Sequence, residues 1–309
     1  MFTAVPLQGN PLAVVIDSTS PSLSTPTQAS FANWTNLSET TFLFPPSDPS
    51  KADYSVRIWT PGRELPFAGH PTLGSCAAWL KYGGGDDAKF ASGEENIITQ
   101  ECGIGLVRIR RDPVKKSRLA LAAPDFIKYE PAKEEEIVAI CKKMNIRIED
   151  VLKAQWTDNG PGWVTLLLKS AQAVLNANKS DDFAVGDLNF GLVGAYRQGA
   201  DQLVKAGLLT RQEADVIEEE KDTADKGLQP AAFEIRSIFD HGTLEDPVTG
   251  SLNAGIAKWL ISEGLAPDSY VASQGTAIGR RGRIYVDKEG EEIWVGGDVC
   301  DVISGTVAL

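Results

Sequence analysis

The chain has 309 residues, 42% hydrophobic and 23% charged, so it can bury a full core and is long enough for two lobes. Its formal net charge is −12 and no large basic patch stands out, which argues against nucleic acid or an anionic membrane as partner. The four cysteines lack metal-ligand spacing and only two histidines are present, so we predict no metal site and a reducing, cytoplasmic location.

Short elements follow one another in the first third of the chain. The segment GNPLAVVID (9–17) predicts a turn and a buried strand, and residues 28–36 predict a short helix that leads into a strand over SETTFLF (38–44). A third strand is predicted over YSVRIWT (54–60). The next segment, GHPTLGSCAAWLKYG (69–83), is mostly small or apolar on all sides and ends at glycine, which predicts a helix that is buried all round.

Strands and helices alternate through the rest of the chain. Strands are predicted within IITQECGIGLVRIRR (97–111) and over WVTLLL (163–168). Charged residues predict helices with solvated faces over 134–143 and 212–221. A second helix that is apolar all round is predicted over GSLNAGIAKWLISEG (250–264). We expect no targeting segment, because prolines and a Ser/Thr/Pro stretch interrupt the first thirty residues, and no membrane span, because no apolar run approaches the required length.

Two parts of the chain share the same spacing of Glu, Pro and Gly residues. ELPFAGHPTLG (64–74) and EDPVTGSLNAG (245–255) match at a constant offset of 181 residues, at one Glu, one Pro and two Gly positions. After each buried helix come a Gln, an Ile-Gly pair and an Arg-bearing strand, the second time within 270–287. Such a match without gaps predicts an internal duplication. We therefore predict two lobes, residues 1–125 and 126–309, with the option that the last strand returns to the N-terminal lobe.

Each copy opens its buried helix behind a Gly-x-x-x-x-Gly turn. Pseudo-symmetry would bring the two helix N-termini together, and their free N–H groups and positive ends favour a carboxylate. His70 and Ser251 occupy equivalent positions, each directly after a glycine, and both can donate a hydrogen bond to a bound acid. Each also has a plainer interpretation, Ser251 as a helix N-cap and His70 as a structural residue.

Five motifs, spread over almost the whole chain, resemble those of the phenazine-biosynthesis PhzF-like proteins: LQGNPLAVV, NLSETTF, ELPFAGHPTLG, EDPVTGS and QGTAIGRRGRI. The resemblance implies the diaminopimelate-epimerase-like fold, an α+β arrangement of two pseudo-symmetric lobes. In each lobe a sheet would curl into a barrel around a central buried helix. It also implies a cofactor-independent isomerase site at the lobe interface, a small carboxylic acid as substrate, and a homodimer.

The resemblance also implies roles for particular residues. Glu39 of the NLSET motif would be the acid/base. The groups that would hold the ligand are Gly69, His70, Asp246, Gly250 and Ser251. Without the resemblance, Glu39 would be an exposed residue at a strand start, and Asp246 a turn residue ahead of proline. Leu65 occupies the slot of Asp246 in the first copy, so the turn does not need an acid, and this favours a site role for Asp246.

One segment departs from the family pattern. Relatives commonly have Arg-x-Phe-x-Pro before the second motif, whereas IRSIFDHGT (235–243) has Asp240 and His241 near the usual proline position. The departure leaves the shape of the substrate open. His241 would either line the pocket or cap a surface turn, and we favour the turn.

The leading hypothesis is an isomerase that moves a proton between carbons of a small carboxylic acid, related to trans-2,3-dihydro-3-hydroxyanthranilate isomerase. One alternative is a two-base racemase or epimerase on the same fold, because ECGIG (101–105) imitates a racemase loop. Its counterpart around Ile278 has no cysteine, however, and the positions ahead of the helices hold Ala68 and Asp246. The other alternative is a non-catalytic protein that binds a small acid.

Overall fold

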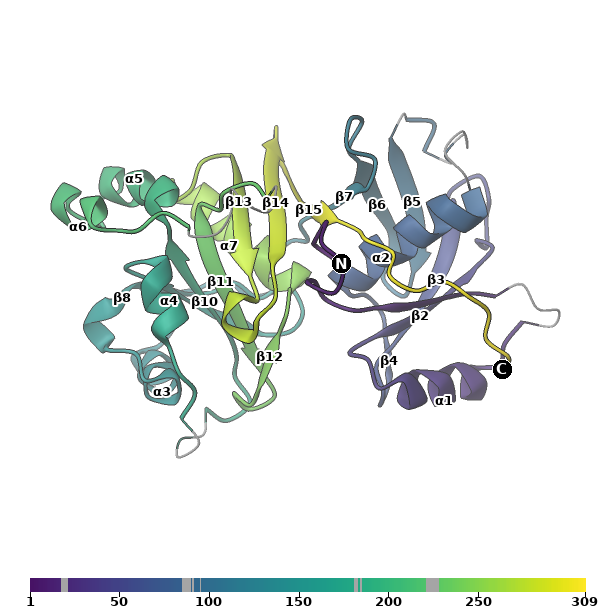
Figure 1. Cartoon of the computed structure of the whole chain (residues 1–309), viewed down its shortest axis with the longest axis horizontal. Coiled ribbons are helices and arrows are strands. Elements are labelled where there is room, and N and C mark those ends of the chain that lie inside the picture. The colour runs from purple at the N-terminus through teal and green to yellow at the C-terminus, as the bar shows by residue number, and fades with distance from the viewer. Residues whose placement is uncertain are drawn as a thin grey trace. The chain divides into compact units, whose positions relative to one another are not determined.

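The computed structural model describes residues 1–17, 22–84, 90, 92–94, 96–180, 183, 185–220 and 228–309. The chain forms two compact units (Figure 1). Unit 1 contains Met1–Ala122 and Gly296–Leu309, and unit 2 contains Ala123–Val295. No helix in the described ranges is long and apolar enough to cross a membrane.

Unit 1 is built on a mixed sheet. Its strands are β1 (Ala13–Ile16), β2 (Thr40–Phe44), β3 (Tyr54–Trp59), β4 (Glu64–Leu65), β5 (Ile97–Cys102), β6 (Gly105–Arg111) and β7 (Arg118–Ala122). They lie in the order β1-β2-β3-β5-β6-β7, with β4 against β3. The pairs β1–β2 and β3–β5 are parallel and the others antiparallel. The predicted strands are confirmed, and the Ile-Gly segment forms the hairpin between β5 and β6.

The helix α2 (Gly69–Trp79) is the centre of unit 1. Every residue from Gly69 to Cys76 is buried, and the helix contacts β1, β2, β3, β5 and β7. The predicted burial is therefore confirmed, because strands cover the helix on several sides. A π-helical turn over Leu80–Gly84 continues the helix, which thus ends within one residue of the predicted Gly83. The helix α1 (Thr25–Thr35) begins earlier than predicted, at the N-cap Ser24, whose side chain accepts from the Thr27 N–H.

Unit 2 combines further strands with five α-helices among its described residues. The strands are β8 (Val151–Trp156), β9 (Trp163–Leu168), β10 (Asn189–Ala195), β11 (Phe233–Phe239), β12 (Leu244–Asp246), β13 (Ser269–Gln274) and β14 (Gly282–Glu289). The helices are α3 (Glu134–Met144), α4 (Ala171–Asn176), α5 (Arg197–Lys205), α6 (Arg211–Asp215) and α7 (Gly250–Ser262). The sheet order is β14-β13-β11-β10-β9-β8, with β12 against β11. Strand β15 (Glu292–Asp298) begins in unit 2 and ends in unit 1.

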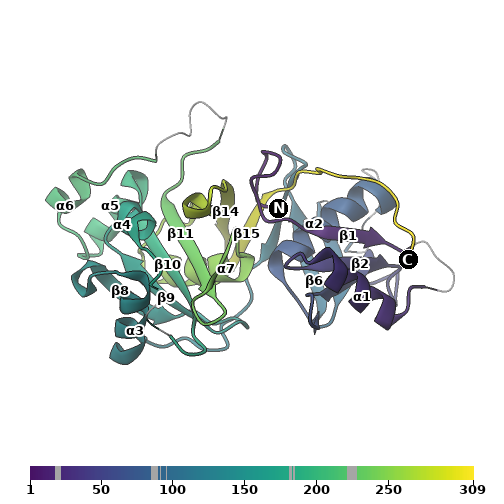
Figure 2. The same cartoon turned by 60° about the horizontal axis from the view of Figure 1, so that its bottom comes forward.

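Strand β9 has one polar residue, Thr165, among apolar ones. Its Val164, Leu166 and Leu168 share an apolar cluster with residues of α3 and α4, and Figure 2 shows α3 beside β8 and β9. Trp163 projects toward the other side, where its indole bonds to Ser251 of α7. All six residues are buried, because helices cover both faces of the strand.

One helix prediction was too long. The acidic segment 212–221 was expected to be helical, but α6 ends at Asp215, and Lys221 lies outside the described residues. Thr210 and Glu213 form a capping box, so the polar side chains of this segment stabilise the helix start.

The helix α7 packs closely against the loop between β8 and β9. A Cβ atom on Gly255 would lie 2.5 Å from the Thr157 carbonyl oxygen, which is part of the backbone. Alanine normally favours a helix over glycine, yet we expect Gly255→Ala to lower the free energy of unfolding by about 1–3 kcal/mol, because the backbone must shift. Urea unfolding measures this. Gly62→Ala is the control, since nothing lies within 4 Å of its Cβ position, and equal effects of the two substitutions would contradict the expected clash.

Candidate functional site

Glu39 and His70 meet inside unit 1. Glu39 directly precedes β2, and His70 is the second residue of α2. The His70 Nε2 atom lies 3.2 Å from the Glu39 Oε2 atom, with side-chain exposures of 7% and 16%. On the other side of the ring, the Asn10 amide nitrogen lies 3.4 Å from His70 Nδ1. The exposed strand-start interpretation of Glu39 is thus wrong, since the carboxylate is largely buried against α2.

The two facing atoms of this pair are close without being well aligned. Their separation fits an ion pair, but neither Glu39 Oε2 nor His70 Nε2 has a hydrogen-bond partner of acceptable geometry within the described residues. Burial lowers the pKa of His70, and the nearby Glu39 only partly opposes this effect. A neutral imidazole beside a buried carboxylate is therefore available at neutral pH. Buried polar atoms without partners are uncommon and indicate a place for a ligand or water.

The backbone N–H groups at the start of α2 are further hydrogen-bond donors. Gly69 is its first residue, and the N-cap Ala68 has no side chain that could accept from the first-turn N–H groups. By contrast, Ser24, Ser170 and Thr210 cap α1, α4 and α6. Among the described residues, the first N–H groups of the buried helix that carries His70 thus have no side-chain cap, and its positive end lies next to Glu39.

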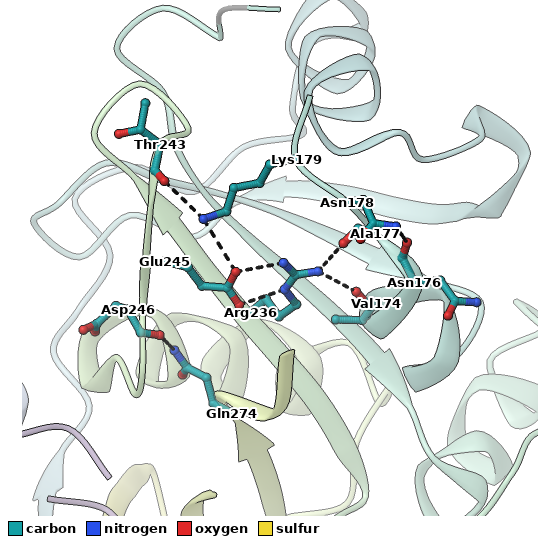
Figure 3. A network of polar contacts seen from close by, with 10 residues as sticks. All are labelled: Val174, Asn176, Ala177, Asn178, Lys179, Arg236, Thr243, Glu245, Asp246 and Gln274. Atoms are coloured by element: carbon teal, nitrogen blue, oxygen red, sulfur yellow. Dashed lines mark hydrogen bonds and ion pairs between the residues drawn. The ribbon is translucent and has the colours of Figure 1, made fainter. Parts of the chain in front are cut away.

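The glutamates that open the two repeated motifs have one structural role. In unit 1, Arg57 of β3 binds Glu64 of β4 through two hydrogen bonds of 2.6 and 2.7 Å. In unit 2, Arg236 of β11 binds Glu245 of β12 through two of 2.8 Å, as Figure 3 shows. Each arginine ties the short motif strand to its neighbour in the sheet. The shared glutamate thus anchors the turn that leads to the helix.

Asp246 lies at the end of β12, in a network that shapes the turn before α7. Its carboxylate accepts from the Thr249 hydroxyl at 2.6 Å, and its carbonyl accepts from the Gln274 amide at 3.1 Å (Figure 3). Thr249 is the N-cap of α7, yet its hydroxyl donates to Asp246 and does not cap the helix. The first N–H groups of α7, including those of Gly250 and Ser251, therefore have no side-chain cap.

Ser251 is the second residue of α7, as His70 is of α2. Its hydroxyl accepts a hydrogen bond of 3.1 Å from the Trp163 indole, and its carbonyl accepts one of 2.8 Å from the Asn159 amide. The N-cap interpretation of Ser251 is wrong, because Thr249 holds that position. Within unit 2, the structure thus brings Asp246, Gly250 and Ser251 together at one helix start.

The two repeated glutamines, Gln100 and Gln274, each contact the first turn of a buried helix. Gln100 of β5 donates to the Thr72 hydroxyl at 3.1 Å. Gln274 of β13 accepts from the Asn253 amide at 2.7 Å. Thr72 and Asn253 are each the fourth residue of their helix, so a strand glutamine holds the first turn of both buried helices.

The sequence motifs did not indicate Asn159 and Trp163, which contact Ser251. Their only signal in the sequence was the Asn-Gly-Pro-Gly turn before β9.

The remaining candidates lie elsewhere. Cys102 ends β5, and burial raises the pKa of its thiol, so it is a poor base at neutral pH. Burial also raises the pKa of Cys76 in α2. His241 lies in the exposed turn after β11, with its Nδ1 3.0 Å from the Gly186 carbonyl oxygen. The surface-turn interpretation of His241 is therefore confirmed.

Comparison with known proteins identifies relatives along the whole chain. A family model described as phenazine biosynthesis-like protein matches residues 1–305. The chain is 31% identical to antisense-enhancing sequence 1 of Schizosaccharomyces pombe, over 99% of this chain and 95% of that protein. It is 46% identical to trans-2,3-dihydro-3-hydroxyanthranilate isomerase of Pseudomonas chlororaphis over 77 residues, which are 25% of this chain and 26% of that enzyme.

A solved structure extends the comparison to the fold. The Bacillus anthracis phenazine biosynthesis protein of the PhzF family matches with a TM-score of 0.69 and 18% identity, over 96% of this chain and 93% of that one. At this identity the likeness shows the fold alone. The PhzF-like fold expected from the sequence motifs is confirmed at that level.

Proposed function

Because the chain belongs to the phenazine biosynthesis-like PhzF family, we propose that it is an isomerase that moves a proton between carbons of a small carboxylic acid, with Glu39 as the acid/base. The buried contact between Glu39 and His70, beside the uncapped start of α2, is the observation that carries the proposal. Several relatives are named isomerases, among them trans-2,3-dihydro-3-hydroxyanthranilate isomerase. Acids of that type are the first substrates to test.

The chemistry follows from the groups at the two helix starts. The Glu39 carboxylate removes a proton from a C–H group of the bound acid, and the electron pair that is left spreads over the conjugated system toward the substrate carboxylate. Helix N–H groups that face this carboxylate stabilise the developing negative charge. Glu39 then returns the same proton to another carbon. Neutral His70 donates a hydrogen bond to the substrate. Because its ring carries no positive charge, it does not form an ion pair that would keep Glu39 from taking the proton.

The finer arrangement is part of the same proposal. Two pseudo-symmetric lobes would each wrap a sheet around one helix, α2 or α7, and both helix starts would act on one acid without a cofactor. Their lack of side-chain caps and the glutamine at each first turn support this arrangement. A cytoplasmic homodimer, implied by composition and by the family resemblance, completes it, and light scattering on the purified protein would measure the oligomer.

Isotope labelling tests the proton transfer. Trans-2,3-dihydro-3-hydroxyanthranilate and related acids, deuterated at the carbon that loses its hydrogen, are turned over in ordinary water and followed by NMR. We expect part of the deuterium at the receiving carbon, because a single carboxylate in a closed site exchanges slowly with water. Complete washout together with an active Glu39→Gln and an inactive Cys102→Ala would contradict the proposal and favour the cysteine racemase.

A further inference from the structure

The side chain of Gln274 in β13 is completely buried and bonds to both ends of the turn that leads into α7. Its Oε1 atom accepts from the Thr249 N–H at 3.1 Å and from the Asn253 amide at 2.7 Å. Its Nε2 atom donates to the Asp246 carbonyl oxygen and to the Thr249 hydroxyl oxygen, both at 3.1 Å. One side chain therefore uses its acceptor and both its donors on the turn and on the first turn of α7.

Backbone groups determine the orientation of the Gln274 amide. The Thr249 N–H can only donate and the Asp246 carbonyl can only accept, so a flipped amide would bring like groups together on both sides. The Nε2 group therefore faces the Thr249 hydroxyl oxygen, which accepts from it. The proton of this hydroxyl is then directed to the Asp246 carboxylate, 2.6 Å away. A chain of donors thus runs from Gln274 through Thr249 to Asp246.

This chain explains why the N-cap threonine of α7 does not cap its helix. A threonine at an N-cap normally accepts from the N–H of the second or third helical residue. Thr210 does so at the start of α6, where it accepts from the Glu213 N–H at 3.2 Å. Thr249 makes no such bond to α7. The difference is that Gln274 donates to the Thr249 oxygen and Asp246 accepts its proton.

The first copy of the repeat supports the same interpretation. The N-cap of α2 is Ala68, which has no hydroxyl group that could cap the helix. There the equally buried Gln100 accepts from the Tyr54 hydroxyl at 3.0 Å and donates to the Thr72 hydroxyl, inside the helix, at 3.1 Å. The contact between glutamine and N-cap thus accompanies the hydroxyl group.

Building on the function proposed above, we propose that Gln274 is a positioning residue of the acid site. By donating to the Thr249 hydroxyl, it turns this group onto Asp246 and away from the first N–H groups of α7, which then stay available for the carboxylate of a bound acid. Without this donor, the Thr249 hydroxyl caps the helix and competes with the acid. Gln274 is itself buried and acts on the ligand through Thr249.

Benzoate and benzamide, a neutral analogue of about the same size, test the selectivity of this helix start for an anion. Calorimetric titration of the full chain should show at least about fivefold tighter binding of benzoate. In Gln274→Met, which keeps the length of the side chain but has no donor, this ratio should fall below about twofold. Gln274→Asn, whose amide is one methylene too short, repeats the test with a polar side chain. Each ratio is measured on one variant and does not depend on its folded fraction.

Removing the Thr249 hydroxyl separates this role from mere support of the fold. Thr249→Val cannot cap α7, so its ratio should stay above about threefold, and adding Gln274→Met should change that ratio less than about twofold. Gln100→Met is the matched control, because it removes an equally buried glutamine and leaves the contacts of Thr249 in place; its ratio should equal that of the wild type.

Three results would overturn the role of Gln274 and leave the acid site standing. They are a wild-type ratio in both Gln274 variants, an equal fall on Gln274→Met with and without the Thr249 hydroxyl, and a fall in Thr249→Val or in Gln100→Met that matches the fall in Gln274→Met. If the wild type bound benzoate no more tightly than benzamide, the acid site itself would fall, and this inference with it.

Discussion

Replacing Glu39 with glutamine is expected to lower turnover by about 10²–10⁴-fold, while the affinity for the substrate changes little. Glutamine keeps the size of the side chain and its contact with His70, but its amide cannot take up the substrate proton. The measurement is the rate at saturating substrate together with the dissociation constant by calorimetry. A loss of affinity with an unchanged rate would reassign Glu39 to binding.

Cys102→Ala is the control for this experiment. The Cys102 thiol is partly buried and its pKa is raised, so its removal should leave turnover unchanged. A Glu39→Gln variant that keeps most of its activity would contradict the acid/base role. If Cys102→Ala then lost activity, the catalytic base would have to be sought at the end of β5.

Removing Glu245 should strongly destabilise unit 2. The carboxylate and its partner Arg236 are 4% and 5% exposed, and Arg236 also donates to the Val174 and Ala177 carbonyl oxygens. Glu245→Ala leaves the guanidinium buried without its counter-ion, so we expect a loss of about 3–5 kcal/mol in the free energy of unfolding. Urea unfolding, followed by circular dichroism, measures the loss.

The repeat supplies a matched control for this variant. Glu64 makes the same paired contact with Arg57 in unit 1, but the two side chains are 38% and 30% exposed. Glu64→Ala should cost only about 0.2–1 kcal/mol, because water solvates the remaining arginine. A double variant, Arg236→Met with Glu245→Leu, should recover much of the stability, since no buried charge then remains. Equal losses for Glu64→Ala and Glu245→Ala would show that burial does not determine the cost.

Spacing in the sequence predicted the features that depend on short stretches of chain. Apolar residues on all sides of 69–83 and 250–264 predicted two buried helices, because a helix without a polar face must be covered. The mostly apolar run WVTLLL predicted β9, and the repeated Glu-x-Pro pattern predicted both turns. Glu39 and Asp246 could not be assigned from their surroundings in the sequence, because an acid at a strand start or in a turn is usually exposed. The family motifs distinguished both residues, and for Asp246 the repeat added that Leu65 occupies its slot in the first copy.

Contacts between distant segments were decided by the tertiary structure. No local pattern shows that His70 lies against Glu39. The two residues are 31 positions apart, and the packing of the buried α2 against β2 brings them together. The same holds for the Thr249 hydroxyl, which bonds to Asp246 and does not cap α7, and for Asn159, whose amide nitrogen donates to the Ser251 carbonyl. The sequence by itself determined which helices are buried and where their turns begin, because these depend on composition and local spacing. Which polar atoms remain unpaired at the helix starts depends on packing between segments far apart in the chain, and that only the folded structure decides.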